Sequence, residues 1–581
     1  MDYRGGQARA APGGDQPRWR RQGPRRLRIM PAVWLRLLSA IFGGLLLAWA
    51  FPVSIEPVPL PEPFGPLPLP VPGMDPRGGF AQLPLVAFIA LIPLLEATRL
   101  SRRPSEAFLW GYLGGLVWQL LNQLWIGIFG LLPLLLLVGY FALPLGVFCL
   151  LAYYLLRTPR PLMLLWGLPA LWTGWEYLRS FGVWSYPWSL LGYSQVNLVP
   201  LIQVADLGGV FAVSFVVALV NVAIFILLAP VGRFRLRLGA AFLGTGVVLA
   251  ALAYGEVLLA WQPYRAPAPT LKLGLVQGGL DCRRRWDDDL LNLTLEHYVP
   301  PADAMLTEWK QEQQRRQQER QGLVGPWQPE HMLVMWPETV LPVRGGLDPR
   351  RPEKVPFQLM SLLADHDDCA LLLGALGKPT DDEHAQNGLL LVEPNERLRW
   401  VHSKVRLVPY GEVVPFREVV RFLRYPWGNY DISAGRSVAP FSWQGHTLGG
   451  LVCFDNVYGF ITRQQTLDGA EALVLATNNS WYKLHSGIRQ HCDIDVLRAV
   501  ECRRPLARVS TTGWSQLVGP DGRVINSTAI AGPGQITAWV PATQGLSPYV
   551  LLGDVFAQLC LIIAVLLLLR PVVVGTSEGI L

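Results

Sequence analysis

The chain has 581 residues, of which 51% are hydrophobic and only 16% are charged, and its mean hydropathy is +0.29. Charged residues make up about 25% of a typical soluble domain, so this composition excludes a disordered protein and a single soluble domain. The hydrophobic excess is confined to residues 30–260 and 549–570, whereas 262–548 has an ordinary soluble composition. The composition therefore predicts a membrane protein that carries one large aqueous domain.

The net charge of +7 is concentrated at the N-terminus, where eight arginines stand between residues 4 and 28. A basic tail can bind nucleic acid, but a basic tail before a hydrophobic span is more typical of cytoplasmic retention by the positive-inside rule. We therefore predict a cytoplasmic tail over residues 1–29 and no nucleic-acid partner. The apolar run that follows lacks a small-residue cleavage site, which indicates an uncleaved anchor.

Runs of about 20 apolar residues are typical of helices that span a bilayer. Seven runs form a predicted transmembrane domain over residues 30–261, and an eighth lies in a C-terminal segment, 549–581. The predicted spans are 31–51, 82–98, 107–129, 131–156, 161–178, 209–229, 238–260 and 550–569. The second span is short and contains Pro84 and Pro93. The proline-rich stretch before it, 52–72, is predicted to be an extended loop.

Arginines between the spans predict the orientation. If the N-terminus is cytoplasmic, three connections lie on the cytoplasmic side, and each carries arginines. These are Arg99, Arg102 and Arg103, then Arg157 and Arg160, then Arg233, Arg235 and Arg237. After seven crossings the chain reaches the far side. We therefore predict a multi-pass protein of a bacterial inner membrane, with the aqueous domain, 262–548, on the periplasmic side.

The connection 179–208 is rich in aromatic residues, namely Trp184, Tyr186, Trp188 and Tyr193. Aromatic residues commonly form a belt at the membrane interface. The alternative is that they line a site for a lipid substrate.

The aqueous domain mixes apolar strands with helices, which predicts a layered α/β domain with a buried sheet. Strands are expected at 271–277, 332–336, 369–374, 388–393, 448–453 and 472–476. A helix is expected over 286–298. The polar run 308–320 is interpreted as a solvated helix extension or an insertion without assigned function.

Three candidate chemical groups each follow a predicted strand. Glu338 follows Trp336 and Pro337, Lys404 precedes the sequence LVPYGE, and Cys453 ends the strand LGGLVC. Each alone has an ordinary interpretation, as a surface charge or a small core residue. Together they supply a nucleophile, a base to take its proton, and a cation to stabilise an oxyanion. Sequence spacing does not show that they meet in space.

The ordered motifs WPE, Lys404 with LVPYGE, and the strand-ending Cys453 resemble the nitrilase superfamily, with its Glu-Lys-Cys triad on an αββα sandwich. Further motifs, which include membrane segments, resemble the apolipoprotein N-acyltransferase family from about residue 30 to 570. They include PALW at 169–172, EYLR at 176–179, GYSQ at 192–195, NNSW at 478–481, Gln490-His491 and GLSPY at 545–549.

The resemblance implies an acyltransferase with ping-pong chemistry and no cofactor. Cys453 would take an acyl chain from a membrane phospholipid as a thioester, with Glu338 as base and Lys404 as oxyanion stabiliser. The acceptor would be the α-amino group of the diacylglyceryl-modified N-terminal cysteine of an apolipoprotein. Glu412 matches a second essential glutamate that positions Lys404. Trp286, Asn387 and Trp481 match supporting or substrate-binding positions, and Phe454 and Asp455 stand at two further positions of that kind.

The chain departs from the family pattern at several of these positions. Phe454-Asp455 stands where the family has Tyr-Glu, and Trp481-Tyr482-Lys483 stands where it has Trp-Phe-Gly. Two other interpretations therefore stay open. One is a membrane-tethered amidase or nitrilase that uses water as acceptor, and the other is a non-catalytic lipid-binding homologue.

Cysteines and histidines give weaker signals. No two-histidine metal spacing or C-x-x-C pattern occurs, so we predict no metal. Cys492 and Cys502 lie ten residues apart, and both a disulfide and two free thiols are compatible with that spacing.

Overall fold

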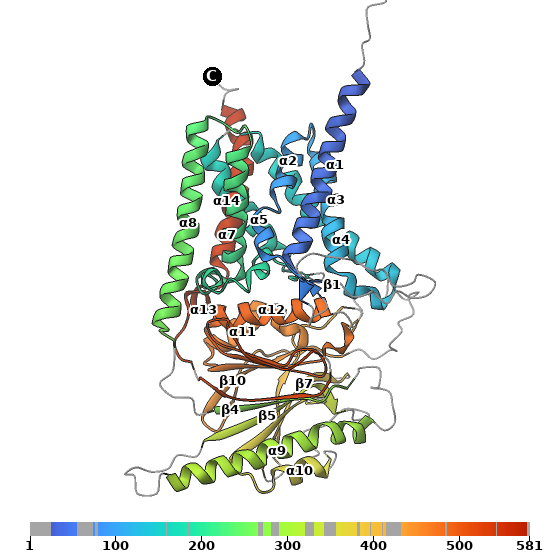
Figure 1. Ribbon diagram of the computed structural model, residues 1–581, viewed down its shortest axis with the longest axis vertical. Helices are drawn as coiled ribbons and strands as arrows, with labels where there is room; N and C mark the ends of the chain where they lie inside the picture. The colour runs from blue at the N-terminus through green and yellow to red at the C-terminus, as the bar shows by residue number, and fades with distance from the viewer. Residues whose placement is uncertain are drawn as a thin grey trace, which may run out of the picture.

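A computed structural model describes residues 25–54, 74–75, 80–158, 160–182, 185–264, 271–280, 290–319, 330–341, 356–379, 384–394, 397–409, 411–413, 432–482, 485–530, 532–541 and 543–577. Figure 1 shows a bundle of long helices at one end and a layered α/β domain at the other. The N-terminal and C-terminal helices, blue and red, both belong to the bundle.

The bundle is built from helices of residues 25–261 and the C-terminal helix. Their bounds are α1 Arg25–Ala50, η1 Pro84–Phe88, α2 Ile92–Leu100, α3 Pro104–Asn122, η2 Leu124–Phe129, α4 Leu131–Leu156, α5 Pro161–Leu178, η3 Leu191–Gln195, α6 Val199–Ile202, α7 Ala205–Leu228, α8 Phe234–Trp261, α13 Pro548–Leu552 and α14 Val555–Ser577. Helix α14 packs against α5 and α7, so the C-terminal helix belongs to the same bundle as the helices of the N-terminal half. A small sheet of β1 (Val53–Ser54), β2 (Met74–Asp75) and β3 (Phe80–Ala81) follows α1.

Four helices in the described part of the chain are long and apolar enough to cross a membrane. They cover Ala32–Ala50, Leu131–Leu156, Ala205–Leu228 and Phe234–Trp261, and a shorter apolar helix covers Val555–Arg570. The expected span 82–98 is not one helix. It divides into η1 and α2, because Pro84 and Pro93 each occupy the first turn of a short helix, where a missing N–H costs nothing.

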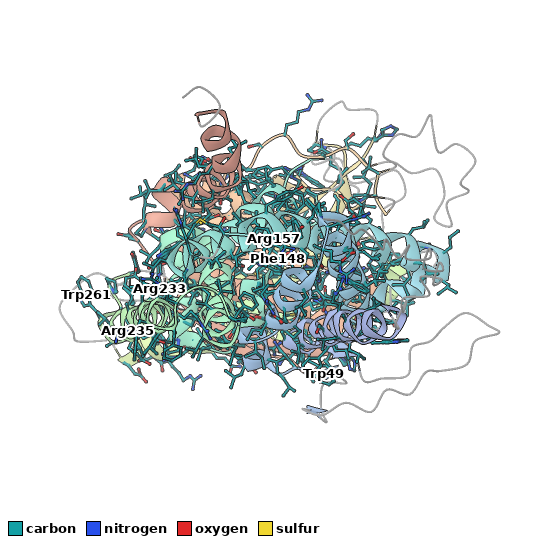
Figure 2. The ribbon with its side chains drawn as sticks, turned by 90° about the horizontal axis from the view of Figure 1, so that it is seen from above. Trp49, Phe148, Arg157, Arg233, Arg235 and Trp261 are labelled. Atoms are coloured by element: carbon teal, nitrogen blue, oxygen red, sulfur yellow. The ribbon has the colours of Figure 1, made fainter. Side chains whose placement is uncertain are left out.

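The arginine-bearing connections α4–α5 and α7–α8 lie at the end of the bundle away from the α/β domain (Figure 1). Figure 2 looks onto the molecule from that end and labels Arg157, Arg233 and Arg235. Tyr153 Oη donates to the Arg102 carbonyl at 2.9 Å, and an Arg157 side-chain N–H donates to the Ser101 carbonyl. The connections that hold Arg102 and Arg157 therefore lie side by side.

The α/β domain contains two six-stranded mixed sheets. One has the order β15-β4-β5-β6-β7-β8, and the other β14-β13-β12-β11-β10-β9. The strands are β4 Leu271–Gln277, β5 His331–Leu341, β6 Cys369–Gly377, β7 Gln386–Glu393, β8 Arg397–Ser403, β9 Phe441–Trp443, β10 His446–Val452, β11 Ala472–Thr477, β12 Leu506–Ser510, β13 Gln516–Val518, β14 Val524–Ser527 and β15 Gly534–Val540. Strands β4, β5 and β6 pair in parallel, as do β10, β11 and β12.

The two sheets stack between helices as the αββα sandwich that the resemblance implied (Figure 1). Helices α9 (Leu290–Glu319) and α10 (Phe357–Leu363) cover the sheet that contains β4 and β5. Helices α11 (Gly459–Leu467) and α12 (His485–Cys502) lie between the bundle and the sheet that contains β10 and β11. Alternation along β5 explains the layers: Leu333 and Met335 join the large core between the sheets, whereas Met332 and Val334 join the core beneath α9.

All six predicted strands are confirmed, although β5 extends to Leu341 and β10 ends one residue before Cys453. The run 308–320 forms no separate insertion in its described part. It continues the predicted helix as a single α9, which runs through Pro300 and Pro301. Trp309 of this helix is buried, and its indole N–H donates to Asp368 at 2.6 Å, so one side of α9 belongs to the core.

Candidate active site

The ends of four strands, two from each sheet, meet on one edge of the sandwich. Glu338 lies near the end of β5, Lys404 directly follows β8, Cys453 directly follows β10, and Asn478 directly follows β11. Hydrogen bonds of Glu338 and Asp455 join these ends. Groups placed directly after buried strands are held by a rigid scaffold while their side chains can still face a substrate.

Glu338 reaches the site because β5 loses its register against β6. The pairing shifts between Trp336 and Leu341, so residues 337–340 form a bulge, and Thr339 takes a φ of +53°. The backbone of β6 approaches this bulge at Gly374, where a Cβ would stand 2.3 Å from the Pro337 carbonyl oxygen and 2.4 Å from Glu338 Cα. Only glycine fits there without moving Glu338.

The Glu338 carboxylate is buried and accepts three hydrogen bonds. Its Oε1 accepts from Asn387 Nδ2 at 2.7 Å and from Lys404 Nζ at 3.3 Å, and its Oε2 accepts from the Asn478 backbone N–H at 2.8 Å. The donors come from β7, the end of β8 and the end of β11. The carboxylate is thus fixed in orientation by groups from both sheets.

Lys404 lies between two carboxylates. Its Nζ donates to Glu412 Oε1 at 2.9 Å as well as to Glu338, and its side chain is 1% exposed. Burial opposes the ammonium charge, but the fields of Cys453, Glu338 and Glu412 outweigh burial and raise the pKa of Lys404 well above its ordinary value. At neutral pH the side chain is therefore a cation, which is what an oxyanion needs.

Glu412 and Asn387 complete this arrangement. Asn387 Nδ2 also donates to Glu412 Oε1 at 3.1 Å, and Glu412 Oε2 accepts from the Val408 backbone N–H at 2.9 Å. The Asn387 carbonyl oxygen accepts from the Lys404 backbone N–H at 2.7 Å. Asn387 therefore holds Lys404 through the main chain and both carboxylates through its amide.

Cys453 stands at the turn that follows β10, in a left-handed conformation with φ of +48°. Such strain in a residue other than glycine persists where the surroundings enforce it, often at functional sites. Burial and, next, the Glu338 charge raise the pKa of the Cys453 thiol to about 12, while Lys404 acts in the opposite direction. At neutral pH Cys453 is a thiol, so a neighbouring base is required to generate the thiolate.

Asp455 ties the Cys453 turn to the Lys404 segment. Its fully buried carboxylate accepts from the backbone N–H groups of Val405 at 3.0 Å, Arg406 at 2.9 Å and Val452 at 3.2 Å, and His402 Nε2 lies 3.1 Å away. The shorter side chain at this departure from the family pattern is therefore fully engaged. Its position is structural, within the backbone of the site.

Phe454 belongs to an aromatic cluster that joins the site to the helical bundle. This aromatic cluster consists of Tyr186, Trp188, Phe454 and Tyr458. The Phe454 ring stacks 6.3 Å from both Tyr186 and Trp188 and meets Tyr458 edge-on at 5.6 Å. Tyr186 and Trp188 come from the aromatic connection of the bundle, so apolar rings from that connection lie directly beside the Cys453 turn.

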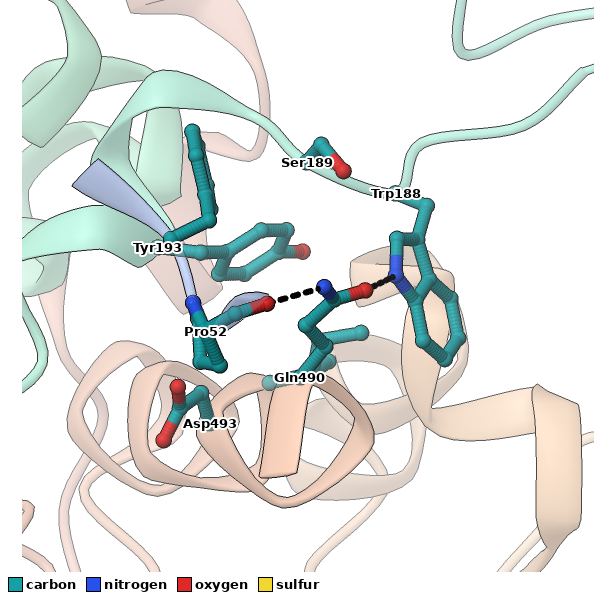
Figure 3. A pocket seen from close by; sticks show the side chains of 8 residues that line it. Pro52, Trp188, Ser189, Tyr193, Gln490 and Asp493 are labelled. Carbon is teal, nitrogen blue, oxygen red and sulfur yellow. Dashed lines mark hydrogen bonds between the residues drawn. The ribbon is translucent and has the colours of Figure 1, made fainter. Parts of the chain in front are cut away.

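The junction between bundle and sandwich is also polar. Gln490 of α12 accepts from the Trp188 indole N–H at 2.7 Å and donates to the Pro52 carbonyl at 2.8 Å, as Figure 3 shows. It also donates to Asn122 Oδ1 at 2.8 Å. A small pocket at this junction is lined by Phe51, Pro52, Trp188, Ser189, Tyr193, Gln490, Asp493 and Ile494. These buried bonds hold the sandwich in one position against the bundle.

The structure thus brings together Glu338, Lys404, Glu412, Asn387, Phe454 and Asp455 around the Cys453 turn. Trp481 ends the short helix η7 (Asn479–Trp481), which follows Asn478. Trp286 and Lys483 lie outside the described residues. In the part of the chain that the structure describes, no three His, Cys, Asp or Glu side chains gather as a metal site would require.

Sequence reasoning missed the Asn478 backbone donor, although Asn478 begins the NNSW motif, because a backbone N–H carries no sequence signal. It also missed the buried His402, which stands in no motif. It also left open whether Cys492 and Cys502 pair. Both are free and buried. They stand ten residues apart on the single helix α12, a separation of about 15 Å, whereas a disulfide needs Cα atoms within about 7 Å.

Two family comparisons cover both parts of the chain. The Apolipoprotein N-acyltransferase N-terminal domain matches residues 76–223, and the Carbon-nitrogen hydrolase family matches residues 328–540. An amidase from the nitrilase superfamily of Nesterenkonia, solved as a mutant, aligns with 50% of this chain and 97% of its own, at 18% identity and a TM-score of 0.33.

Curated relatives align over almost the whole chain. The apolipoprotein N-acyltransferase of Geobacter metallireducens is 30% identical over 541 residues, which cover 90% of this chain and 92% of the relative. Those of Chlorobaculum tepidum and Gloeobacter violaceus are 26% and 29% identical and align with 82% and 83% of this chain and 90% and 89% of their own.

Proposed function

The chain belongs to the apolipoprotein N-acyltransferase family, and we propose that it transfers an acyl chain from a membrane phospholipid to the α-amino group of an apolipoprotein's diacylglyceryl-modified N-terminal cysteine. The transfer passes through a thioester on Cys453. Lipoprotein N-acylation is the activity that the names of the relatives carry, and the nitrilase-like domain supplies the acyl-transfer chemistry.

In the first half-reaction Glu338 takes the proton of the Cys453 thiol, and the sulfur attacks the ester carbonyl carbon of the donor. Lys404 stabilises the oxyanion of the tetrahedral intermediate. As the C–O bond breaks, Glu338 returns the proton to the departing oxygen, and lysophospholipid leaves.

In the second half-reaction the acceptor amine attacks the thioester carbonyl and Glu338 takes its proton. When the C–S bond breaks, the proton returns to sulfur and the thiol is restored. Atoms and charges balance over this ping-pong cycle without a cofactor.

The observation that supports this proposal is the 3.3 Å contact between Glu338 and Lys404 in a buried site, where the charges of both groups act on the Cys453 thiol. The aromatic cluster beside the Cys453 turn includes two side chains from the bundle. The position of these two rings favours the interpretation that the aromatic connection 179–208 lines a site for a lipid substrate and is not only an interfacial belt. The ester of the proposed donor has to reach the Cys453 sulfur from the bilayer.

We further propose the arrangement of the chain in the membrane. Eight crossings would divide it into a cytoplasmic tail at 1–29, a seven-helix domain at 30–261, the catalytic domain at 262–548 and a C-terminal helix and tail at 549–581. The arginine-bearing connections at the end of the bundle away from the sandwich support a catalytic domain on the periplasmic side.

Two experiments test the function. Mass spectrometry of a lipoprotein N-terminus from cells with and without this protein is expected to differ by one acyl chain. An alkyne-bearing phospholipid is expected to label the wild-type chain through a hydroxylamine-sensitive bond, and Cys453→Ala is expected to remain folded without label. Full activity of Cys453→Ala would refute the thioester route.

The rival interpretations give different results in the same assay. Hydrolysis of a small amide without N-acylation of a diacyl peptide would indicate a membrane-tethered amidase. A folded wild-type protein that takes no label would indicate a non-catalytic lipid-binding homologue.

A further inference from the structure

We propose that Arg406 binds the phosphate diester of the phospholipid donor and thereby selects donors that carry a phosphate. This inference rests on the proposed function and adds a head-group subsite to it. It assigns a role to a side chain that lies outside the triad and its supporting groups.

Arg406 differs from the other buried or half-buried arginines near the bundle because, among the described residues, its side chain has neither an ionic partner nor a hydrogen bond to the protein. Arg504, which also lacks an ionic partner among these residues, donates to four backbone carbonyls instead. Arg498, Arg503 and Arg508 pair with Glu501, Asp206 and Asp495, respectively. Among the residues that the structure describes, no carboxylate pairs with Arg406, and its buried Nε has no hydrogen-bond partner. An arginine that is partly desolvated and uncompensated in this way favours an anionic ligand.

The guanidinium is nevertheless held in place by aromatic rings. Its Cζ lies 4.8 Å from the centroid of Tyr458 and 5.2 Å from that of Phe460. Stacking on ring faces leaves the edge of the planar group, with its N–H donors, available to two oxygens of a phosphate. The backbone is fixed too, because the Arg406 N–H donates to Asp455 at 2.9 Å.

The guanidinium lies close to the reacting centre. Arg406 follows Lys404 by two residues, and Tyr458, under the guanidinium, meets Phe454 at 5.6 Å between ring centroids. Phe454 is the residue after Cys453. In a glycerophospholipid the acyl ester and the phosphate are attached to the same three-carbon glycerol unit, so an ester at Cys453 places the phosphate within a short distance of the sulfur.

The position also matches the level of lipid head groups. Phe460, under the guanidinium, is 39% exposed, and neighbouring α13, which leads into α14, exposes Leu551 and Leu552. Tyr458 Oη donates to the Ser185 carbonyl of the bundle at 3.0 Å. Arg406 therefore stands beside an exposed apolar rim, where a lipid head group is a more accessible anion than a phosphate from solution.

The first test compares two donors in the full-length protein: dioctanoylphosphatidylglycerol and dioctanoylglycerol, which has the same esters but no phosphate. The readout is kcat/KM for acylation of a diacylglyceryl peptide. The ratio of kcat/KM for the phospholipid to kcat/KM for dioctanoylglycerol is expected to fall at least tenfold in Arg406→Gln, which corresponds to about 1.4 kcal/mol. Most of this fall is expected to come from a higher KM for the phospholipid. Arg406→Lys is expected to recover part of the ratio.

Arg523→Gln is the matched control. It removes the same charge from an exposed arginine that is 56% exposed and paired with Asp521, and the donor ratio is expected to stay at the wild-type value. The proposal would be overturned if Arg406→Gln lost activity equally with both donors. It would also be overturned if Arg406→Gln kept full activity with both donors.

A binding measurement separates this subsite from the proposed function. In the Cys453→Ala background, calorimetry with the same two lipids is expected to show tighter binding of the phospholipid, and Arg406→Gln is expected to abolish the difference. If the wild-type protein acylates no peptide but this difference is present, the proposed function fails and the subsite stands. The head-group site is refuted if the phospholipid binds equally tightly with and without Arg406. It is also refuted if inorganic phosphate binds as tightly as the phospholipid.

Discussion

The Lys404 ammonium lies closer to Glu412, at 2.9 Å, than to Glu338, at 3.3 Å. The two carboxylates therefore have different surroundings. Glu412 Oε2 accepts from the Val408 backbone N–H, so the Glu412 carboxylate is held by the backbone of the same segment that follows Lys404. Glu338 is fixed by three donors from other segments, and its charge acts on the Cys453 thiol, so it is the carboxylate that we propose for proton transfer.

Replacement of Glu412 by Gln is expected to lower the pKa of Lys404, because one of the carboxylate charges that raise it is removed. We expect kcat to fall about 10- to 100-fold, since one charge-assisted hydrogen bond of about 1.5–3 kcal/mol is lost, and the alkaline limb of the pH–rate profile to move to lower pH. Glu312→Gln is the control, because Glu312 pairs with Lys272 and Arg316 on the far side of the sandwich. An unchanged profile in Glu412→Gln would show that Glu412 does not act through Lys404.

Replacement of Glu338 by Gln is expected to make the Cys453 thiol more acidic and yet to lower the rate of acyl transfer. The Glu338 charge raises the pKa of Cys453, which is about 12 in the wild-type protein, so its removal lowers that pKa. The rate of acyl-enzyme formation is nevertheless expected to fall at least 100-fold, because a positioned base typically contributes about 10²–10⁴. Alkylation of Cys453 by iodoacetamide between pH 7 and 10 measures the thiolate, and a Glu338→Gln curve shifted to higher pH would contradict the arrangement.

Replacement of Asp455 by Asn is expected to destabilise the protein by about 1–3 kcal/mol, because the amide nitrogen would face a buried N–H donor. Asp455→Glu is expected to cost about as much, since an extra methylene enters a fully buried site. Thermal unfolding in detergent measures both effects. Wild-type stability in Asp455→Asn would mean that the carboxylate does not hold the Lys404 segment to the Cys453 turn.

Replacement of Gly374 by Ala is expected to reduce activity strongly while the protein remains folded. The new Cβ would collide with Pro337 and Glu338 backbone atoms at 2.3 and 2.4 Å, so the bulge that aims Glu338 must move, and a displacement of about 1 Å can cost about 10²-fold in rate. The helical Gly246, whose Cβ would meet nothing within 4 Å, provides the control as Gly246→Ala. Normal acyl-enzyme formation in Gly374→Ala would show that the bulge tolerates movement.

Much of this protein follows from its sequence alone. The apolar runs, the six strands and the chemical residues near the end of β5 and directly after β8 and β10 are local properties, because hydrophobic periodicity and length act within one element. The family motifs add the identity of the chemistry. Where local signals conflicted, the sequence did not decide the structure. Prolines divided the predicted span 82–98 into two short helices, so one continuous helix there was wrong. The run 308–320 is compatible by sequence with a helix extension or an insertion, and the extension is confirmed in its described part, because the buried side of α9, with Trp309, packs on the sheet.

Other features were decided only by the tertiary structure. Three sets of contacts join segments that are far apart in the chain. They are the Asn478 backbone N–H on Glu338, the contacts of Asp455 with His402, Val405 and Arg406, and the stacking of Tyr186 and Trp188 on Phe454. No local pattern encodes such contacts, because backbone donors are the same in every residue and ring contacts depend on how the bundle meets the sandwich. The sequence thus determined which groups are available, and packing of the two sheets against each other and of α12 against the bundle determined which of them meet.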